Sequence, residues 1–184
     1  MKAQITQMRL VEIVKIIFVV CFLVCCKPAE NTINKNELEY DLINFMGYKN
    51  DVLNKTTLSY SDLSQKNLFT LDEINNRNYK NNWVSEIKPY VNFDTIFNSK
   101  QKELINKKFR SLKRIKLEKK KIENKDALSN NGNTVITFPF FQKNDKGELF
   151  GFVYRLSSPE SILFIFIKTN KGWKEFAKMV LGIS

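Results

Sequence analysis

The residues best suited to covalent chemistry in this 184-residue chain are three cysteines, and all of them lie near its N-terminus. Cys21 precedes the adjacent pair Cys25 and Cys26, and the chain contains no cysteine after residue 26. Paired cysteines in an exported protein normally belong to a disulfide framework. Here a disulfide cannot crosslink the downstream part of the chain, because that part has no cysteine with which to pair. The two adjacent thiols therefore require a different explanation.

The cysteine pair ends an apolar segment that follows several positive charges. The run from Ile16 to Cys26 is uninterrupted and eleven residues long, whereas a helix needs about 20 residues to span a bilayer. Lys2, Arg9 and Lys15 are the basic residues that precede it. A basic segment followed by a short apolar run is typical of a secretory signal peptide. The prediction of export is the same whether translation starts at Met1 or at Met8.

Leu23-Val24-Cys25-Cys26 resembles the lipobox of bacterial lipoproteins, which consists of Leu, a small or aliphatic residue, a small residue and Cys. The resemblance implies cleavage before Cys26, a diacylglycerol on its sulfur and a fatty acyl group on the new N-terminus. Two or three acyl chains hold a protein stably on a membrane, where a single chain does not. We therefore expect a lipoprotein signal peptide over residues 1–25. An ordinary signal peptide with incidental cysteines is the alternative.

The residues after the predicted cleavage site should form a short tether and one folded domain. Residues 26–35 are polar after the cysteine and should link acylated Cys26 flexibly to the domain. Residues 36–184 are numerous enough for a single domain with its own core. We expect the protein to lie in the bacterial cell envelope, lipid-anchored on the periplasmic or the outer-membrane face.

Several classes of active site require residues that the chain does not contain. Histidine is absent, which excludes the catalytic triads and dyads that use it and the metal sites that it ligates. Cys26 is the only cysteine after the leader, so thiolate catalysis and iron–sulfur ligation are excluded as well. Glu148, Glu160 and Glu175 are candidate acids and bases, yet no spacing brings two of them to one face. We therefore expect a non-enzymatic protein without a cofactor or a metal.

The first half of the chain contains two helix candidates. Apolar residues at helical spacing predict a first helix over residues 37–48, opened by Asn36 as N-cap and ended near Gly47. Thr70 and Glu73 have the spacing of a capping box, which predicts that a second helix begins there.

A third helix is expected from about Ser99, in the segment that carries most of the positive charge. Ile105, Phe109 and Leu112 fall on one side of such a helix and should face the core. Lysines intrude on this stripe farther along, so we expect the packed part to fade after Ile115.

The segment from Lys100 to Lys125 contains twelve basic and three acidic residues, and its excess of positive charge equals that of the whole chain after the leader. Such a surface could bind an anionic envelope lipid, a glycan or an acidic protein. Nucleic acid is not expected as a partner, because Phe109 is the segment's only aromatic residue for base stacking. A solvated helix without a partner is the alternative. The candidate residues are Lys107, Lys108, Arg110, Lys113, Arg114, Lys116, Lys119, Lys120 and Lys121.

The C-terminal part of the chain predicts an antiparallel sheet. Four short apolar runs, "TVITFPFF", "ELFGFVYR", "SILFIFIK" and "WKEFAKMV", are separated by turn-forming connectors. Short connectors join antiparallel neighbours, so we expect a four-stranded meander. The predicted fold class is therefore α+β, with N-terminal helices packed on this C-terminal four-stranded antiparallel meander.

Side-chain patterns assign positions within the predicted meander. Phe150, Phe152 and Tyr154 alternate and should share one face of the second strand. The third strand is apolar on both faces, so we expect it to be the most buried. Pro139 lacks an amide donor and suits an edge for the first strand. Lysines of the fourth strand, Lys174 among them, should protect the other edge from pairing.

The run from "TVITFPFF" to "GWKEF" resembles the C-terminal part of uncharacterised lipoproteins of the Bacteroidetes group, which carry a prolyl segment, a hairpin and a closing Gly-Trp hairpin. The match involves Pro139, Phe140, Phe141, Gly172 and Trp173 and covers about the last third of the chain. The resemblance implies a hairpin geometry and no functional residue.

A few further residues could bind a small molecule. Trp83 and Trp173 could line a pocket, although such aromatic side chains are more often part of a core. Tyr154 and Arg155 could bind an anion beside Gly151, and that glycine is equally explained by a bulge or by close packing. The alternative to a binding or scaffolding domain is therefore a small-molecule-binding cone of the nuclear-transport-factor-2 type, which a large internal cavity would distinguish.

Overall fold

The computed structural model of the chain describes residues 36–47, 51–64, 71, 91–158 and 160–183. The chain divides into two units, residues 1–35 and 36–184, and all of the described residues belong to the second unit. The predicted signal peptide and tether therefore lie outside the described residues, as does the second predicted helix apart from Leu71.

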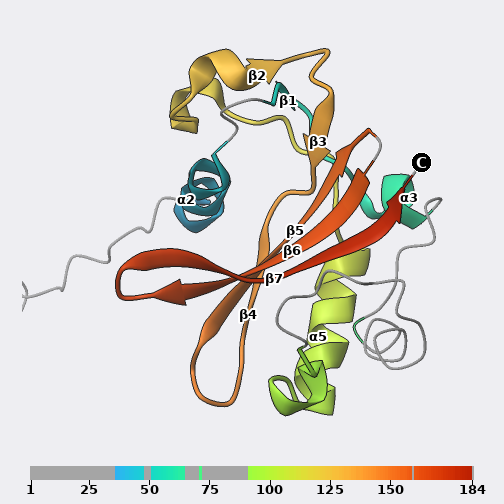
Figure 1. Cartoon of the computed structure of the whole chain (residues 1–184), viewed down its shortest axis with the longest axis vertical. Helices are drawn as coiled ribbons and strands as arrows, with labels where there is room; N and C mark the ends of the chain where they lie inside the picture. Colours follow the sequence, from blue (N-terminus) through green and yellow to red (C-terminus); the bar gives the residue numbers. More distant parts are fainter. Residues whose placement is uncertain (1–35, 48–50, 65–70, 72–90, 159, 184) are drawn as a thin grey trace, which may run out of the picture. The chain divides into compact units, whose positions relative to one another are not determined.

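The described strands form one mixed sheet with the order β2-β1-β3-β5-β6-β7, and β4 pairs with β5 as well (Figure 1). The strands are β1 (Leu53–Asn54), β2 (Leu128–Ser129), β3 (Thr134–Ile136), β4 (Phe140–Lys143), β5 (Leu149–Ser157), β6 (Glu160–Thr169) and β7 (Gly172–Ile183). Strand β1 is parallel to β2 and to β3, and the other pairs are antiparallel. The α+β class is confirmed, whereas the four-stranded antiparallel meander is wrong in strand number and in the direction of these short strands.

The second, third and fourth predicted strands are confirmed as β5, β6 and β7, joined in sequence as antiparallel neighbours. Strand β6 lies between the other two, which is the position expected for the run that is apolar on both faces. Strand β7 ends the described strand order, and Lys174 on it is exposed. A lysine at such an edge opposes pairing with another chain.

The first predicted strand is broken into β3 and β4 by Thr137, Phe138 and Pro139. Proline has no amide hydrogen to donate, so a continuous ladder beside β5 cannot pass through it. The Thr137 hydroxyl accepts a hydrogen bond of 3.0 Å from the Tyr154 amide, and the Thr137 amide donates to the Tyr154 carbonyl at 2.9 Å. A side chain thus replaces one backbone partner at the break. Of these two described strands, β4 is an edge and β3 is not, because β3 is covered by β1.

Both faces of the sheet are buried, because alternate residues of β6 belong to different hydrophobic clusters. Ile162, Phe164 and Phe166 join the cluster of helix α2 (Glu37–Met46), which we call the α2-side core. Leu163 and Ile165 join the cluster of helix α5 (Ser99–Arg110), which we call the α5-side core. Successive side chains of a strand point to opposite faces, so the two helices cover opposite faces of the sheet (Figure 1).

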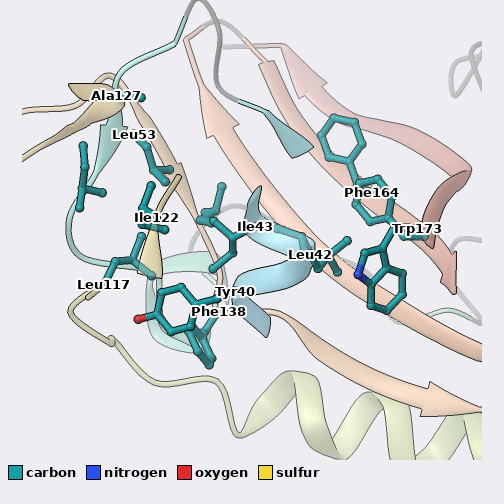
Figure 2. Packing of buried hydrophobic residues seen from close by; sticks show 14 of the residues in the cluster. Tyr40, Leu42, Ile43, Leu53, Leu117, Ile122, Ala127, Phe138, Phe164 and Trp173 are labelled. Carbon is teal, nitrogen blue, oxygen red and sulfur yellow. The ribbon is translucent and has the colours of Figure 1, made fainter. Parts of the chain in front are cut away.

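Helix α2 confirms the first predicted helix, except at its cap. Tyr40, Leu42 and Ile43 are buried and point toward the sheet and the β1–β2 region (Figure 2). Asn36 stands at the predicted N-cap position, but it has a left-handed backbone with φ 82° and its side chain makes no capping hydrogen bond. Gly47 follows the helix with φ 55°, a conformation that suits glycine, and its amide donates to the Asn44 carbonyl.

The α5-side core is built largely from aromatic rings. Phe150, Phe152 and Tyr154 share one face of β5, as predicted, and contact rings from elsewhere in the chain. Phe97 packs edge-on against Phe150 at 5.0 Å between ring centroids, and Phe109 lies 4.8 Å from Tyr154. Burial raises the pKa of the Tyr154 phenol, because a phenolate would lose its hydration there. The cavity found here measures about 10 Å³, so the rings fill this layer.

Candidate functional site

The predicted acylation site, Cys26, lies outside the described residues, and so does Trp83. The basic segment is described completely. Its nine candidate residues occur in three consecutive local structures: helix α5, an extended stretch after it, and the short 3-10 helix η2 (Lys119–Lys121).

Helix α5 begins where the sequence predicts it, because both partners of a capping box are present. The Asn98 side chain accepts from the Gln101 amide at 2.9 Å, and the Gln101 side chain accepts from the Asn98 amide at 2.9 Å. Both side chains also donate to the Asp145 carboxylate in the β4–β5 turn, at 3.0 and 2.8 Å. The cap therefore fixes the first turn of the helix and also ties it to the sheet.

Helix α5 ends at Arg110, well before the end of the predicted basic helix. The Ser111 hydroxyl donates to the Lys108 carbonyl at 2.7 Å, and the chain then becomes extended. The stretch runs beside residues 55–60, with the Leu117 amide donating to the Lys55 carbonyl at 2.8 Å. The expectation that the helix from Ser99 stays packed as far as Ile115 is therefore wrong.

The helix stops because its apolar stripe serves two different cores. Ile105 and Phe109 pack into the α5-side core, whereas Ile115 and Leu117 pack into the α2-side core. One straight helix cannot reach both faces of a sheet. In the extended stretch Ile115 and Leu117 point inward, and Lys116 between them is exposed.

Lys108 is held by the protein itself and is unavailable to a partner. Its ammonium donates to the Phe141 carbonyl at 2.5 Å and to the Gln142 side chain at 2.9 Å, joining α5 to β4. Partial burial lowers the pKa of Lys108, because the charged form loses hydration.

Arg114 is paired with Asp62 of helix α3 (Tyr60–Ser64). The Arg114 Nε atom donates to Asp62 at 2.9 Å, and Nη2 donates to the second carboxylate oxygen. The Ser59 amide and hydroxyl each donate to Asp62 at 2.7 Å. The hydrogen bonds from Arg114 lower the pKa of Asp62 and outweigh the opposite effect of its burial. We did not predict Asp62 as the partner of Arg114. The spacing of Ser59 and Asp62 is that of a capping box, and this signal in the sequence could have indicated that Asp62 lies at the start of a helix.

Lys120 and Lys121 share the carboxylate of Glu118. Lys121 lies 2.9 Å from it and Lys120 lies 3.5 Å away. Lys121 also lies over the Tyr40 ring, 5.0 Å from its centroid, and the Tyr40 hydroxyl accepts from the Glu118 amide. Hydrogen bonding from Lys121 lowers the pKa of Glu118. This pair secures η2 against helix α2.

The other five candidates are exposed and form no ion pair with any described residue. We call them the unpaired cations: Lys107, Arg110, Lys113, Lys116 and Lys119. They come from all three local structures of the segment. The structure thus separates the predicted patch into cations that have an intramolecular partner and cations that have no ion-pair partner among the described residues.

The remaining candidates from the sequence do not form a catalytic constellation. Glu148 accepts from Asn144 in the β4–β5 turn, Glu160 begins β6, and Glu175 lies in β7. No cluster of three or more residues able to ligate a metal occurs among the described residues.

Trp173 is confirmed as a core residue rather than a pocket residue. Its ring stacks on Phe141 with centroids 5.6 Å apart, and its indole donates to Asp41 of α2 at 2.9 Å. Lys168 pairs with the same carboxylate and lies over the indole at 4.9 Å. The closing hairpin, β6–β7, is thereby fastened to helix α2.

Within the described part of the chain, no helix is both long and apolar enough to cross a membrane. The chain matches no protein-family model, and neither the curated proteins nor the solved structures contain a match to it.

Proposed function

We propose that this protein is an envelope-anchored lipoprotein, and that its folded domain is a non-enzymatic binding or scaffolding module for an anionic partner. The lipobox-like sequence ending at Cys26 supports the anchor. The unpaired cations carry the proposal for the domain, because neighbouring cations of the same segment pair with a carboxylate or donate to the sheet, whereas these form no ion pair with a described residue. Exposed cations without partners attract anions over about a Debye length, which is about 8–10 Å at physiological salt.

The chemistry of the unpaired cations fits phosphate or carboxylate groups presented on a surface. Anionic envelope lipid, an acidic glycan and an acidic protein all present such groups, and the extended stretch offers Lys113 and Lys116 to them. Nucleic acid fits less well, because Phe109 is buried and leaves no ring of the segment for base stacking. The cavity between α5 and the sheet measures about 10 Å³, which is too small for a ligand, so it does not support a ligand-binding cone.

The anchor is tested by labelling cells with a palmitate analogue. The wild-type protein and Cys25→Ala should become labelled, whereas Cys26→Ala should remain an unlabelled precursor, because acylation requires the sulfur of residue 26. Labelling of Cys26→Ala together with loss of label from Cys25→Ala would move the processing site by one residue. Absence of label from every form would reject the anchor.

The binding role is tested with residues 36–184 and vesicles that contain phosphatidylglycerol, with an acidic polysaccharide in a parallel assay. Replacing Lys113, Lys116 and Lys119 by Gln should abolish binding at low salt. The melting temperature should change little, because substitutions of exposed residues usually alter stability by no more than about 0.5 kcal/mol each.

A matched control separates the location of charge from its amount. Lys146, Lys171 and Lys174 are also exposed, and replacing them by Gln removes the same charge from the turns and edge of the sheet. This control should retain most of the binding. Equal loss in both triple variants would show that only net charge matters, and absence of wild-type binding to either anionic surface at low salt would favour a solvated segment without a partner.

A further inference from the structure

A second candidate binding place lies on the opposite side of the sheet from α5, beside the C-terminal end of helix α2. A cavity of about 200 Å³ opens there between the helix end and strands β5, β6 and β7. Phe45 of α2, Arg155 of β5, Phe164 and Phe166 of β6, and Glu175 of β7 line it. None of these residues belongs to the basic segment.

The walls of this cavity are aromatic. Phe164 and Phe166 stack with centroids 5.9 Å apart and an angle of 10° between their planes. Phe45 meets Phe166 edge-on at 5.8 Å, yet 47% of the Phe45 side chain surface stays exposed. Figure 2 shows Phe164 on the sheet beside Leu42 and Trp173 of the α2-side core. A large exposed ring next to two buried rings provides an apolar surface that a small molecule can cover.

Arg155 supplies a positive charge to the same cavity. Its guanidinium lies over the Phe164 ring, with the Cζ atom 5.1 Å from the centroid. Its nearest carboxylate among the described residues, Asp51, lies 3.7 Å from Nη1, which is beyond hydrogen-bonding distance. The Nε atom is buried and has no hydrogen-bond partner among the described residues.

A buried N–H group without a partner is uncommon and unfavourable, and an acceptor that reached it after a small shift of the side chain would satisfy it. An arginine suits a carboxylate well, because its planar group can donate two parallel hydrogen bonds. The guanidinium is also positioned on an aromatic ring, so an anion bound to it would place its apolar body near Phe164 and Phe166. The side chain is 23% exposed, which leaves a path for such an anion from solvent.

We propose that this cavity binds a small organic anion, a carboxylate joined to an aromatic or short apolar body. A cavity of about 150 Å³ is enough to hold benzene in a protein core, so about 200 Å³ accommodates one ring and a carboxylate. Glu175 opposes an anion, but it is exposed and therefore well screened, whereas Arg155 is largely buried. The proposal is independent of docking through the unpaired cations.

The test uses the full chain and three probes of similar size: phenylacetate, 2-phenylethanol and 2-phenylethylamine. Calorimetry or ligand-observed NMR gives the dissociation constant of each. Phenylacetate should bind at least about 10-fold more tightly than the alcohol. A hydrogen bond to a charged group contributes more binding free energy than a neutral one, and the difference corresponds to about this factor in the dissociation constant. The amine should bind most weakly. Equal affinities for acid and alcohol, or tighter binding of the amine, would overturn the proposal, as would no saturable binding of phenylacetate.

Variants then assign the binding to this cavity. Arg155→Gln should weaken phenylacetate about 10-fold and leave the alcohol unchanged, whereas Arg114→Gln removes an arginine elsewhere and should leave both unchanged. Glu175→Gln should strengthen phenylacetate binding. Phe45→Ala should weaken acid and alcohol equally, since it removes a wall. If Arg155→Gln does not fold, the variants at the two exposed positions, Glu175 and Phe45, test whether phenylacetate binds in this cavity. Unchanged phenylacetate binding in both Glu175→Gln and Phe45→Ala would reject this location.

Discussion

Gly151 allows helix α2 to approach the sheet closely, and this contact gives a quantitative test of the fold. A Cβ atom at Gly151 would lie 2.7 Å from Leu42 Cδ2 and 3.1 Å from Phe141 Cε1. Contacts below 3.0 Å essentially do not occur for real Cβ atoms, so Leu42 would have to move. Leu42 is fully buried in the α2-side core and has little room to do so.

We expect Gly151→Ala to destabilise the domain by about 1–3 kcal/mol, the usual cost of an extra methyl group in a packed core. The lower unfolded-state entropy of alanine offsets about 0.5–1 kcal/mol of this cost. Leu42→Ala alone should cost about 2–5 kcal/mol, because it leaves a cavity in the same place.

The double variant should be less destabilised than the sum of the two single variants, by about 1 kcal/mol or more. The alanine methyl at position 151 no longer meets Leu42 and fills part of the space that Leu42 vacates. Substitutions that do not touch each other add to within about 0.3–0.5 kcal/mol. The predicted departure from additivity is therefore measurable.

Urea unfolding of residues 36–184, followed by circular dichroism, measures these free energies. A suitable control is Gly147→Ala in the β4–β5 turn, where φ is +77° and an added Cβ meets nothing within 4 Å. That substitution strains the backbone without contacting Leu42, so its cost should add to that of Leu42→Ala. Additivity in the Gly151 pair as well would refute the packing of α2 over β5.

Three further substitutions test separate parts of the structure. Phe164→Ala, in strand β6 between β5 and β7, should destabilise by about 3–5 kcal/mol in the same unfolding assay, and a melting shift near zero would reject the strand order. The pKa of Asp62 is lowered in the folded state, so its stabilising effect should be full above about pH 4 and decline as pH falls below that value; Arg114→Gln should reduce this part of the pH dependence, and the Ser59 hydrogen bonds should retain the rest. Asn98→Ala should cost about 1 kcal/mol by removing the capping box with Gln101, and an unchanged unfolding midpoint would contradict that role.

The long strands could be predicted because their signals are local and repeated. Strand β6 is apolar at every position from Ile162 to Ile167, and such a run in a sheet implies burial on both faces. The start of α5 was predictable for a similar reason, since a helix beginning near Ser99 needs only a nearby cap. Patterns within one element thus predicted strands β5, β6 and β7 and the start of α5 correctly.

The short strands could not be predicted, because two residues carry no periodicity. Strands β1 and β2 form through backbone pairing between Leu53 and Leu128, which lie far apart in the sequence. Gly132 is part of the reason that the chain fits there, since an added Cβ would lie 2.5 Å from backbone atoms of residues 52–54. Such a contact depends on tertiary packing and leaves only an isolated glycine in the sequence.

The candidate site was predictable in composition but not in arrangement. Counting charges located the basic segment, but it could not reveal that Asp62 neutralises Arg114 or that Lys108 donates to a strand carbonyl. Arg155 shows the opposite case: one arginine within an apolar strand is inconspicuous in the sequence, and its meaning comes from the rings and the unpaired Nε atom around it.

Salt separates the two proposed binding modes, because their charges differ in exposure. The Debye length falls from about 30 Å at 0.01 M salt to about 8 Å at 0.15 M. The unpaired cations are exposed, so vesicle binding should weaken steeply over this range. Arg155 is largely buried beside Phe164, where salt screens little, so phenylacetate affinity should fall by less than about 3-fold. A steep loss in both assays would place phenylacetate on the protein surface instead of in the cavity.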